Sequence, residues 1–213
     1  MRPSAPLALL FAMSLLTSAA HAQHVAFGDV ERGTASKDFV PALTGGDRQG
    51  EWKLVDDATA DRGKALAQVD ADPTDYRFPL AIYMPTVQSD IEATIHFRPI
   101  SGKVDQAAVV AVRLVNRNNY YVARANALEN NVRFYRVIAG RREQIATANV
   151  PVDSGKWHTL GLRAEGPRFT VSLDGKALHT SIDTTFPAPG KIALWTKADS
   201  LIHFDWLDIK PVK

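Results

Sequence analysis

Much of the chain alternates apolar and polar residues with a period of two. The alternation is clearest in residues 90–98. One parity there holds Ile91, Ala93, Ile95 and Phe97, and the other holds Asp90, Glu92, Thr94, His96 and Arg98. Because successive side chains of a strand point to opposite faces of a sheet, this stretch predicts a half-buried β-strand.

Similar stretches follow one another through the chain, separated by turn residues. They cover residues 64–69, 107–115, 120–126, 132–139, 142–149, 157–165, 168–173, 176–182, 190–196 and 201–211. The intervening turns are rich in Asn and Gly, which tolerate positive φ, and Asp174-Gly175 is a strong hairpin signal. The alanine-rich residues 56–68 are the only helix candidate. Gly63 interrupts them, so we interpret them as a loop that leads into a strand.

About a dozen strands at near-regular spacing rarely stay in one open sheet. The sequence therefore predicts an all-β fold, an antiparallel two-sheet jelly-roll sandwich. A length of 213 residues suits a single domain of this class.

The first residues have the pattern of an export signal. Arg2 precedes a short apolar run at residues 7–16, and Ala20 and Ala22 occupy small-residue positions before a cleavage point. A membrane anchor is the rival interpretation, but a spanning helix needs about 20 apolar residues. We expect a signal peptide at residues 1–22, a single mature domain at residues 23–213, no transmembrane segment, and a periplasmic or secreted bacterial protein.

Composition narrows the function classes. The chain contains no cysteine, which excludes thiol catalysis and thiolate metal sites. Its 25 Lys and Arg nearly balance 23 Asp and Glu, and no block of like charge occurs. A nucleic-acid-binding protein should carry a basic face, so nucleic acid is not an expected partner.

Several motifs resemble a known superfamily. They are Trp157-His158-Thr159-Leu160, Glu165-Gly166, Phe169-Thr170-Val171, Leu173-Asp174-Gly175-Lys176, residues 190–200 with Phe204-Asp205, and residues 119–131. The first four resemble the WHxL…G.F.V.LDG signature of laminin-G-like and concanavalin A-like jelly rolls, and the last two resemble the C-terminal strands of the same superfamily. Within that superfamily, residues 37–209 are most similar to the 3-keto-disaccharide hydrolase domain family, often labelled glycoside hydrolase family 16-like. The resemblance implies the jelly-roll fold and a carbohydrate-related function.

If the chain is a hydrolase, Glu92 and His96 are the catalytic candidates. A retaining glycosidase needs two carboxylates about 5–5.5 Å apart, and family 16 enzymes place acids at alternate positions of one strand. Asp90 and Glu92 have this parity, but Thr94 stands where a third acid belongs, and His96 follows. A solvated outer strand face is the alternative explanation.

A ligand-binding face is the preferred hypothesis. Its predicted members are Arg98, Arg113, Tyr120, Arg124, Asn126, Arg133, Trp195 and Lys197. Parity should bring most of them together on neighbouring strands, in one hollow of the sheet. Arginine and asparagine bind sugar hydroxyls or carboxylates, and tyrosine or tryptophan stacks on a sugar ring. The predicted partner is an oligosaccharide or polysaccharide. An ordinary wet sheet face would show similar residues.

No cofactor is required, but a structural calcium ion is a candidate. The apolar parity changes between Phe204 and Leu207, which predicts a β-bulge at Asp205-Trp206. The bulge would direct the Asp205 carboxylate towards one point, with Asp29 as a second oxygen ligand. An Asp205 that only accepts backbone hydrogen bonds is the alternative.

Three functions thus remain open. The preferred one is an exported glycan-binding module. The second is a 3-keto-disaccharide hydrolase, and the third is an envelope structural or interaction domain without a small ligand, which would have only a flat surface.

Overall fold

The computed structural model describes residues 21–29 and 37–212. The predicted signal peptide therefore lies almost wholly outside the described residues. In chain order the elements are β1 (Gln23–Ala26), the 3-10 helix η1 (Phe27–Asp29), β2 (Phe39–Gly45), β3 (Trp52–Asp56), β4 (Lys64–Gln68), β5 (Arg77–Gln88), β6 (Ile91–Ser101), β7 (Ala107–Asn116), β8 (Asn119–Asn126), β9 (Asn131–Ile138), β10 (Arg141–Asn149), β11 (His158–Glu165), β12 (Arg168–Leu173), β13 (Lys176–Ile182), β14 (Gly190–Thr196) and β15 (Leu201–Pro211).

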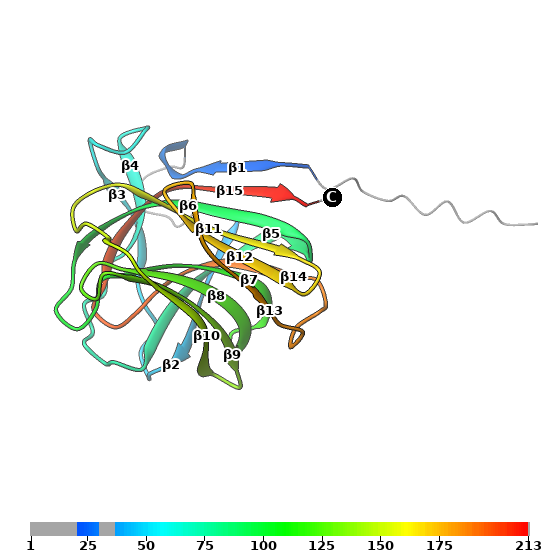
Figure 1. Cartoon of the computed structure of the whole chain (residues 1–213). Helices are drawn as coiled ribbons and strands as arrows, with labels where there is room; N and C mark the ends of the chain where they lie inside the picture. The colour runs from blue at the N-terminus through cyan, green and yellow to red at the C-terminus, as the bar shows by residue number, and fades with distance from the viewer. Residues whose placement is uncertain (1–20, 30–36, 213) are drawn as a thin grey trace, which may run out of the picture.

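These strands form two antiparallel sheets that pack face to face (Figure 1). The eight-stranded sheet has the order β13-β12-β11-β6-β15-β4-β3, and β1 pairs with β15. The seven-stranded sheet has the order β10-β9-β8-β7-β14-β5-β2. Within the described part of the chain, no helix is long and apolar enough to cross a membrane. The predicted jelly-roll sandwich is confirmed.

Every stretch with predicted strand alternation forms a strand, and the bounds agree to within one residue, except that β6 runs to Ser101. The alternation pattern predicted no strand at the residues of β1, β2, β3 and β5. β5 is the longest strand of the structure, yet its apolar residues run together and Pro79 and Pro85 interrupt them. Proline is unusual inside a sheet, so this segment carried no recognisable strand signal.

The main core lies between the two sheets. β6 contributes its apolar parity, and Ile91, Ala93, Ile95 and Phe97 are all fully buried. β7 contributes Val110 and Val112 from the facing sheet. Burying one large apolar side chain stabilises a fold by about 1.5–3 kcal/mol, so this layer holds the sandwich together.

A second apolar cluster lies on the outer face of the seven-stranded sheet. Its buried members are Phe78, Leu80, Val109, Ala111, Leu114, Tyr120, Val122, Tyr135, Val137, Ala193 and Trp195. β7 therefore buries both of its faces: Val110 and Val112 point into the sandwich, and Val109 and Ala111 point outwards. A strand buried on both faces has a continuous apolar sequence, as residues 107–112 do.

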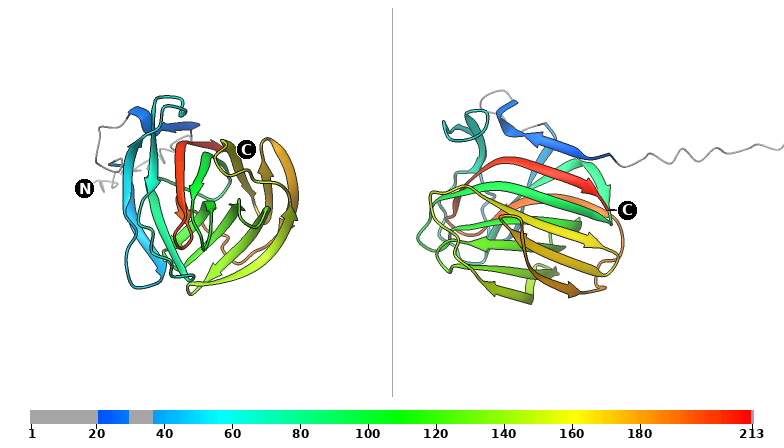
Figure 2. Two further views of the ribbon diagram at one scale, coloured as in Figure 1. Left: turned by 90° about the vertical axis from the view of Figure 1, so that its left-hand side faces the viewer. Right: turned by 45° about the horizontal axis from the view of Figure 1, so that its top comes forward.

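The seven-stranded sheet hides this outer face by curling over it. β10 and β5 are five strand positions apart in the sheet order, which is about 24 Å along a flat sheet. Yet the guanidinium carbon of Arg142 on β10 lies 4.5 Å from the ring centroid of Phe78 on β5. Tyr76 Oη, just before β5, donates to the Gly140 carbonyl in the β9–β10 turn at 2.7 Å. The strong curvature of the strands is visible in Figure 2.

Replacing Phe78 by Ala should lower the free energy of unfolding by about 3–5 kcal/mol. The ring is fully buried, and its centroid lies 4.7 Å from that of Trp195 in a stacked arrangement. Denaturant unfolding followed by circular dichroism measures the change. Val115→Ala is the control, since Val115 is 57% exposed, and it should cost less than about 0.5 kcal/mol. Equal effects of the two substitutions would mean that water reaches the outer face.

Candidate functional site

Six of the eight predicted ligand residues lie on the outer face of the seven-stranded sheet. They are Tyr120, Arg124 and Asn126 on β8, Arg133 on β9, Trp195 on β14, and Lys197 just after β14. Their parity matches that of the outer apolar cluster, which contains Tyr120, Val122, Tyr135 and Trp195. The structure thus brings these six together, and their role in ligand binding stays a prediction.

The two aromatic members cannot stack on a sugar as the structure stands. Tyr120 and Trp195 are fully buried inside the curl. Trp195 Nε1 donates to Tyr120 Oη at 3.2 Å, and the Thr44 hydroxyl shares a 2.7 Å hydrogen bond with the same oxygen. Burial raises the pKa of Tyr120 to about 12. Because the sheet curls over them, Tyr120 and Trp195 belong to the core and cannot act as a surface on which a sugar stacks.

The polar members form a network at one end of the curl. Arg124 Nη2 donates to Glu129 Oε2 and to Asn131 Oδ1, each at 2.9 Å. Glu129 Oε2 also lies 3.0 Å from Arg133 Nη2. Glu129 is therefore an ion-pair partner of both arginines.

Lys197 and Asn126 complete this network through two acids. Lys197 Nζ lies 2.8 Å from Asp105 Oδ2 and 2.5 Å from Asp75 Oδ1. Asn126 Nδ2 donates to Asp105 Oδ1 at 2.5 Å. Burial alone would lower the pKa of Lys197, but the bonds to Asp105 and Asp75 raise it. We call Asp75, Asp105, Arg124, Asn126, Glu129, Asn131, Arg133 and Lys197 the polar cluster.

Arg113 does not belong to this face, which corrects the prediction of one hollow. The β7–β8 register shifts between Val112 and Asn116, and Arg113 has a left-handed φ of 49°. This bulge turns the side chain away from the outer face and towards the end of the sandwich. Gly190 on β14 makes room for the backbone of this bulge, since a Cβ there would lie 2.4 Å from the Arg113 carbonyl carbon.

At the end of the sandwich, the Arg113 side chain forms hydrogen bonds with three different loops. Nε donates to the Ser89 carbonyl at 2.9 Å, Nη1 to Phe186 at 3.1 Å, and Nη2 to Gly166 at 2.6 Å. Nη2 also lies 3.2 Å from Asp90 Oδ1. These residues belong to the β5–β6 turn, the β11–β12 turn and the β13–β14 connection. Arg113 therefore fixes the positions of three loops that converge.

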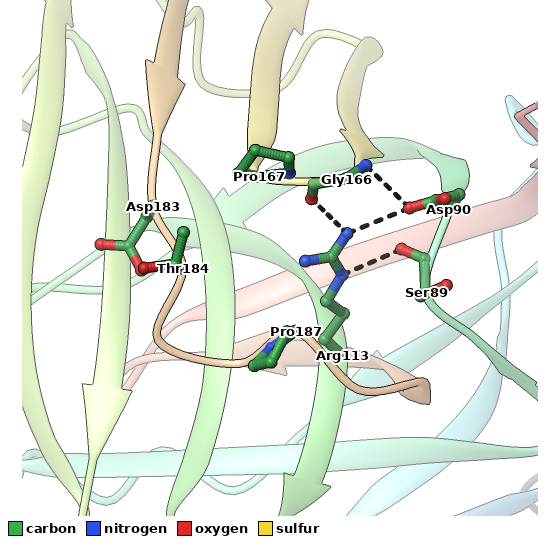
Figure 3. A pocket seen from close by; sticks show the side chains of 8 residues that line it. All are labelled: Ser89, Asp90, Arg113, Gly166, Pro167, Asp183, Thr184 and Pro187. Atoms are coloured by element: carbon green, nitrogen blue, oxygen red, sulfur yellow. Dashed lines mark hydrogen bonds and ion pairs between the residues drawn. The ribbon is translucent and has the colours of Figure 1, made fainter.

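A cavity of about 300 Å³ lies among these loops, and we call it the end pocket (Figure 3). It is lined by Ser89, Asp90, Arg113, Gly166, Pro167, Asp183, Thr184 and Pro187. In Figure 3, Asp183 and Thr184 face Arg113 and Asp90 across the space, with Pro167 and Pro187 on the other sides. Sequence analysis placed only Arg113 of these residues in a ligand site, and in a different one.

The two acids of the end pocket are held by hydrogen bonds. Asp90 Oδ1 accepts from the Gly166 amide at 2.9 Å. Asp183 accepts from Tyr121 Oη at 2.5 Å and from Arg136 Nη1 at 2.8 Å. Burial alone would raise the pKa of Asp183, but these bonds lower it. Among the described residues, the side-chain hydroxyls of Ser89 and Thr184 have no hydrogen-bond partner, so they can bind a ligand.

The hydrolase candidates lie on the outer face of the eight-stranded sheet and do not line the end pocket. His96 is stacked between Trp157 and Trp206, with ring centroids 4.7 and 5.1 Å away. Glu92 Oε2 lies 3.5 Å from Arg163 Nη1. Both faces of the His96 ring are therefore covered by the two indoles.

Arg98 lies on this same face, which corrects its inclusion in the predicted ligand-binding face. Arg98 Nη2 lies 2.5 Å from Asp57 Oδ2, and the guanidinium carbon is 5.3 Å from the Trp157 ring centroid. His203 Nδ1 lies 2.7 Å from the same Asp57 oxygen. Arg98 therefore belongs to an ion-pair cluster on the opposite side of the sandwich.

The predicted bulge at Asp205 is confirmed, because the β15–β6 register shifts between Phe204 and Trp206. The Asp205 carboxylate is buried and accepts from the Asp61 amide at 3.1 Å, and its Oδ2 lies 3.0 Å from His96 Nδ1. Ligand atoms of Asp61, His96 and Asp205 lie within 4.8 Å of one another.

These donors do not fit calcium, which takes six to eight oxygen ligands. The group supplies two carboxylates and an imidazole. The side chain of Asp29, the other predicted ligand, lies outside the described residues. Asp205 accepts one backbone hydrogen bond, as the alternative interpretation expects, and also contacts the His96 side chain.

Comparisons with solved structures find proteins that share this jelly-roll sandwich fold. Carbohydrate-binding module CBM66 from Bacillus subtilis superposes with a TM-score of 0.62 at 23% identity, over 80% of this chain and 94% of that chain. A Bacillus licheniformis beta-glucanase gives 0.59 at 10% identity, over 91% of this chain and 100% of the other.

A mutant of the GH43 protein BlXynB from Bacillus licheniformis gives 0.57 at 13% identity, over 89% of this chain and 39% of that one. The sequence matches no protein-family model and no curated protein. Identities this low show a shared fold, and membership of the 3-keto-disaccharide hydrolase family stays a prediction.

Glu129 should make the stability of the polar cluster depend on pH. Burial alone would raise its pKa, but hydrogen bonds from Arg124 and Asn131 lower it from 4.5 to about 2. Because the folded-state pKa is depressed, ionised Glu129 stabilises the fold above pH 4.5, and this contribution is lost as the pH falls towards about 2.

Thermal unfolding between pH 7 and pH 2 tests this dependence. Glu129→Gln should flatten the loss of stability in the acid range, whereas Glu165→Gln on the other sheet should follow the unsubstituted protein. Parallel acid profiles for the unsubstituted protein and Glu129→Gln would show that this carboxylate is not held in its ionised form.

Proposed function

We propose that this chain is an exported carbohydrate-binding protein that holds a neutral sugar residue in the end pocket and does not cleave it. The observation that carries the proposal is the pocket itself. It combines two free hydroxyls, two acids and two proline rings in a cavity of about 300 Å³, at the lower end of the size range of small-ligand sites.

The chemistry of the lining suits a sugar. Sugar hydroxyls donate to carboxylates and can exchange hydrogen bonds with Ser89 and Thr184. The rings of Pro167 and Pro187 supply apolar surface for the C–H groups of a pyranose or furanose. Arg113 holds all three loops in place before any ligand arrives, and such preorganisation lowers the entropic cost of binding.

The lowered pKa of Asp183 favours binding over hydrolysis. A glycosidase needs a carboxylic acid whose pKa is raised, so that it can protonate the leaving group. The hydrogen bonds to Asp183 lower its pKa instead. Glu92 and His96, the candidates of the 3-keto-disaccharide hydrolase hypothesis, are engaged on another face by Arg163 and Asp205.

The fold comparisons agree with a carbohydrate ligand. One similar structure is described as a carbohydrate-binding module and another as a beta-glucanase. Jelly rolls of this kind thus serve both binding and hydrolysis. Export is proposed from the apolar residues 7–16 and the small residues Ala20 and Ala22.

A glycan array of neutral oligosaccharides, followed by calorimetry with the glycan that binds, tests the proposal. Thr184→Val removes one hydroxyl from the pocket and should weaken binding about three- to tenfold, the effect of one lost hydrogen bond. Thr184→Tyr fills the cavity and should abolish binding. Thr184 is exposed, so neither change should alter the unfolding temperature.

Thr147→Val on β10 is the matched control, since Thr147 is exposed and does not line the end pocket. Its affinity should equal that of the unsubstituted protein. Unchanged binding by Thr184→Tyr would move the sugar site elsewhere. Absence of binding to every glycan would favour the envelope domain without a ligand, and turnover of a 3-keto-disaccharide would favour the hydrolase.

A further inference from the structure

Arg142 lies at the rim of the curled sheet, above the second apolar cluster. It belongs to the edge strand β10, and its side chain reaches across the curl. The guanidinium carbon lies 4.5 Å from the ring centroid of Phe78, 5.3 Å from that of Tyr135 and 6.0 Å from that of Trp195. Arg142 keeps part of its surface exposed, so a ligand can reach it.

Within the described part of the chain, Arg142 differs from the other buried or half-buried arginines in having no carboxylate partner. The described arginines with a carboxylate within ion-pair distance include Arg77, Arg98, Arg113, Arg124, Arg133 and Arg136. Arg142 Nε and Nη1 are buried and have no hydrogen-bond acceptor among the described residues. Buried polar groups almost always have a partner, so an unpaired guanidinium indicates a missing one.

The aromatic rings do not replace that partner. A ring face attracts the positive charge of a guanidinium that lies over it, which offsets part of the cost of burial. The N–H groups of a guanidinium point outwards in its own plane, however, and need acceptors there. Burial is also the largest influence on the Arg142 pKa, and it lowers that pKa. The site therefore holds a cation that is poorly compensated.

The surrounding charges leave an excess of positive charge. Arg142 interacts electrostatically with Arg124, Asp105 and Asp75. Ion pairs connect these three residues to Glu129, Arg133 and Lys197. The three acids are engaged by the other three cations. Arg142 is thus the cation of this group that has no acidic ion-pair partner among the described residues, and it can pair with an anion from solution.

We infer that the Arg142 guanidinium binds an oxyanion, with the carboxylate of an acidic sugar or a free phosphate as its source. Two oxygens of a planar carboxylate match two N–H groups of a guanidinium, and a phosphate offers the same pairing. Nε and Nη1 are buried, so the anion reaches them through the exposed edge of the guanidinium with a small movement of the side chain, and it neutralises the excess charge. This site lies on the seven-stranded sheet, away from the end pocket, and does not depend on the proposed function.

Calorimetric titrations with galacturonate, inorganic phosphate and neutral galactose test the inference. Arg142→Gln removes the charge and part of the donor set, and it should weaken anion binding at least about tenfold, as expected for a charge-assisted pair. Arg141→Gln is the matched control. It makes the same charge change at the neighbouring exposed residue of the same strand, and it should bind the anion like the unsubstituted protein.

Galactose binding should not respond to either substitution. If galacturonate binds and phosphate does not, the source is an acidic sugar; the reverse result assigns the site to phosphate. Equal losses in Arg142→Gln and Arg141→Gln, or no binding of either anion, would overturn the inference. If Arg142→Gln fails to fold, Arg142→Lys is the second variant, because it keeps the charge but cannot form a bidentate hydrogen-bonded pair. It should still show a several-fold loss, and unchanged affinity would also overturn the inference.

Discussion

The seven-stranded sheet carries apolar side chains on both faces, and both faces must be kept from water. The inner face is covered by the eight-stranded sheet. The outer face has no second layer, so the sheet curls until Tyr76 contacts the β9–β10 turn and Arg142 covers Phe78. This constraint decides the shape of the molecule. It closes the face on which a jelly roll could otherwise hold a long polysaccharide.

Closure of that face around Tyr120 and Trp195 leaves other surfaces for ligands, among them the rim and the ends of the sandwich. Arg113 at the end of the sandwich and Arg142 at its rim show two different roles of arginine at these surfaces. Arg113 is fully engaged by carbonyls and by Asp90, and it shapes the end pocket without needing to contact the sugar. Arg142 has aromatic rings beneath it and unused N–H groups. The same residue type thus serves as a structural tie in one place and as a candidate anion receptor in the other.

Local patterns predicted a large part of this structure. The period of two identified β6 and most of the following strands, and the change of parity near Asp205 predicted the bulge that the register confirms. β5 was not predicted as a strand because its apolar residues run together around Pro79 and Pro85. The continuous apolar run of β7 was a usable sign that both of its faces are buried, and it would have argued against an open ligand face beside Tyr120 and Trp195.

The sequence by itself determined the sheet-forming segments, the turns between them and the shared parity of Tyr120, Arg124 and Asn126, because these depend on residues close together in the chain. Only the tertiary structure decided which surfaces remain open. The bulge at Arg113, the convergence of Asp90, Gly166 and Asp183 at one end, and the reach of Arg142 to Phe78 all join residues far apart in sequence. Such contacts follow from how two sheets pack and curl, and no local spacing encodes them.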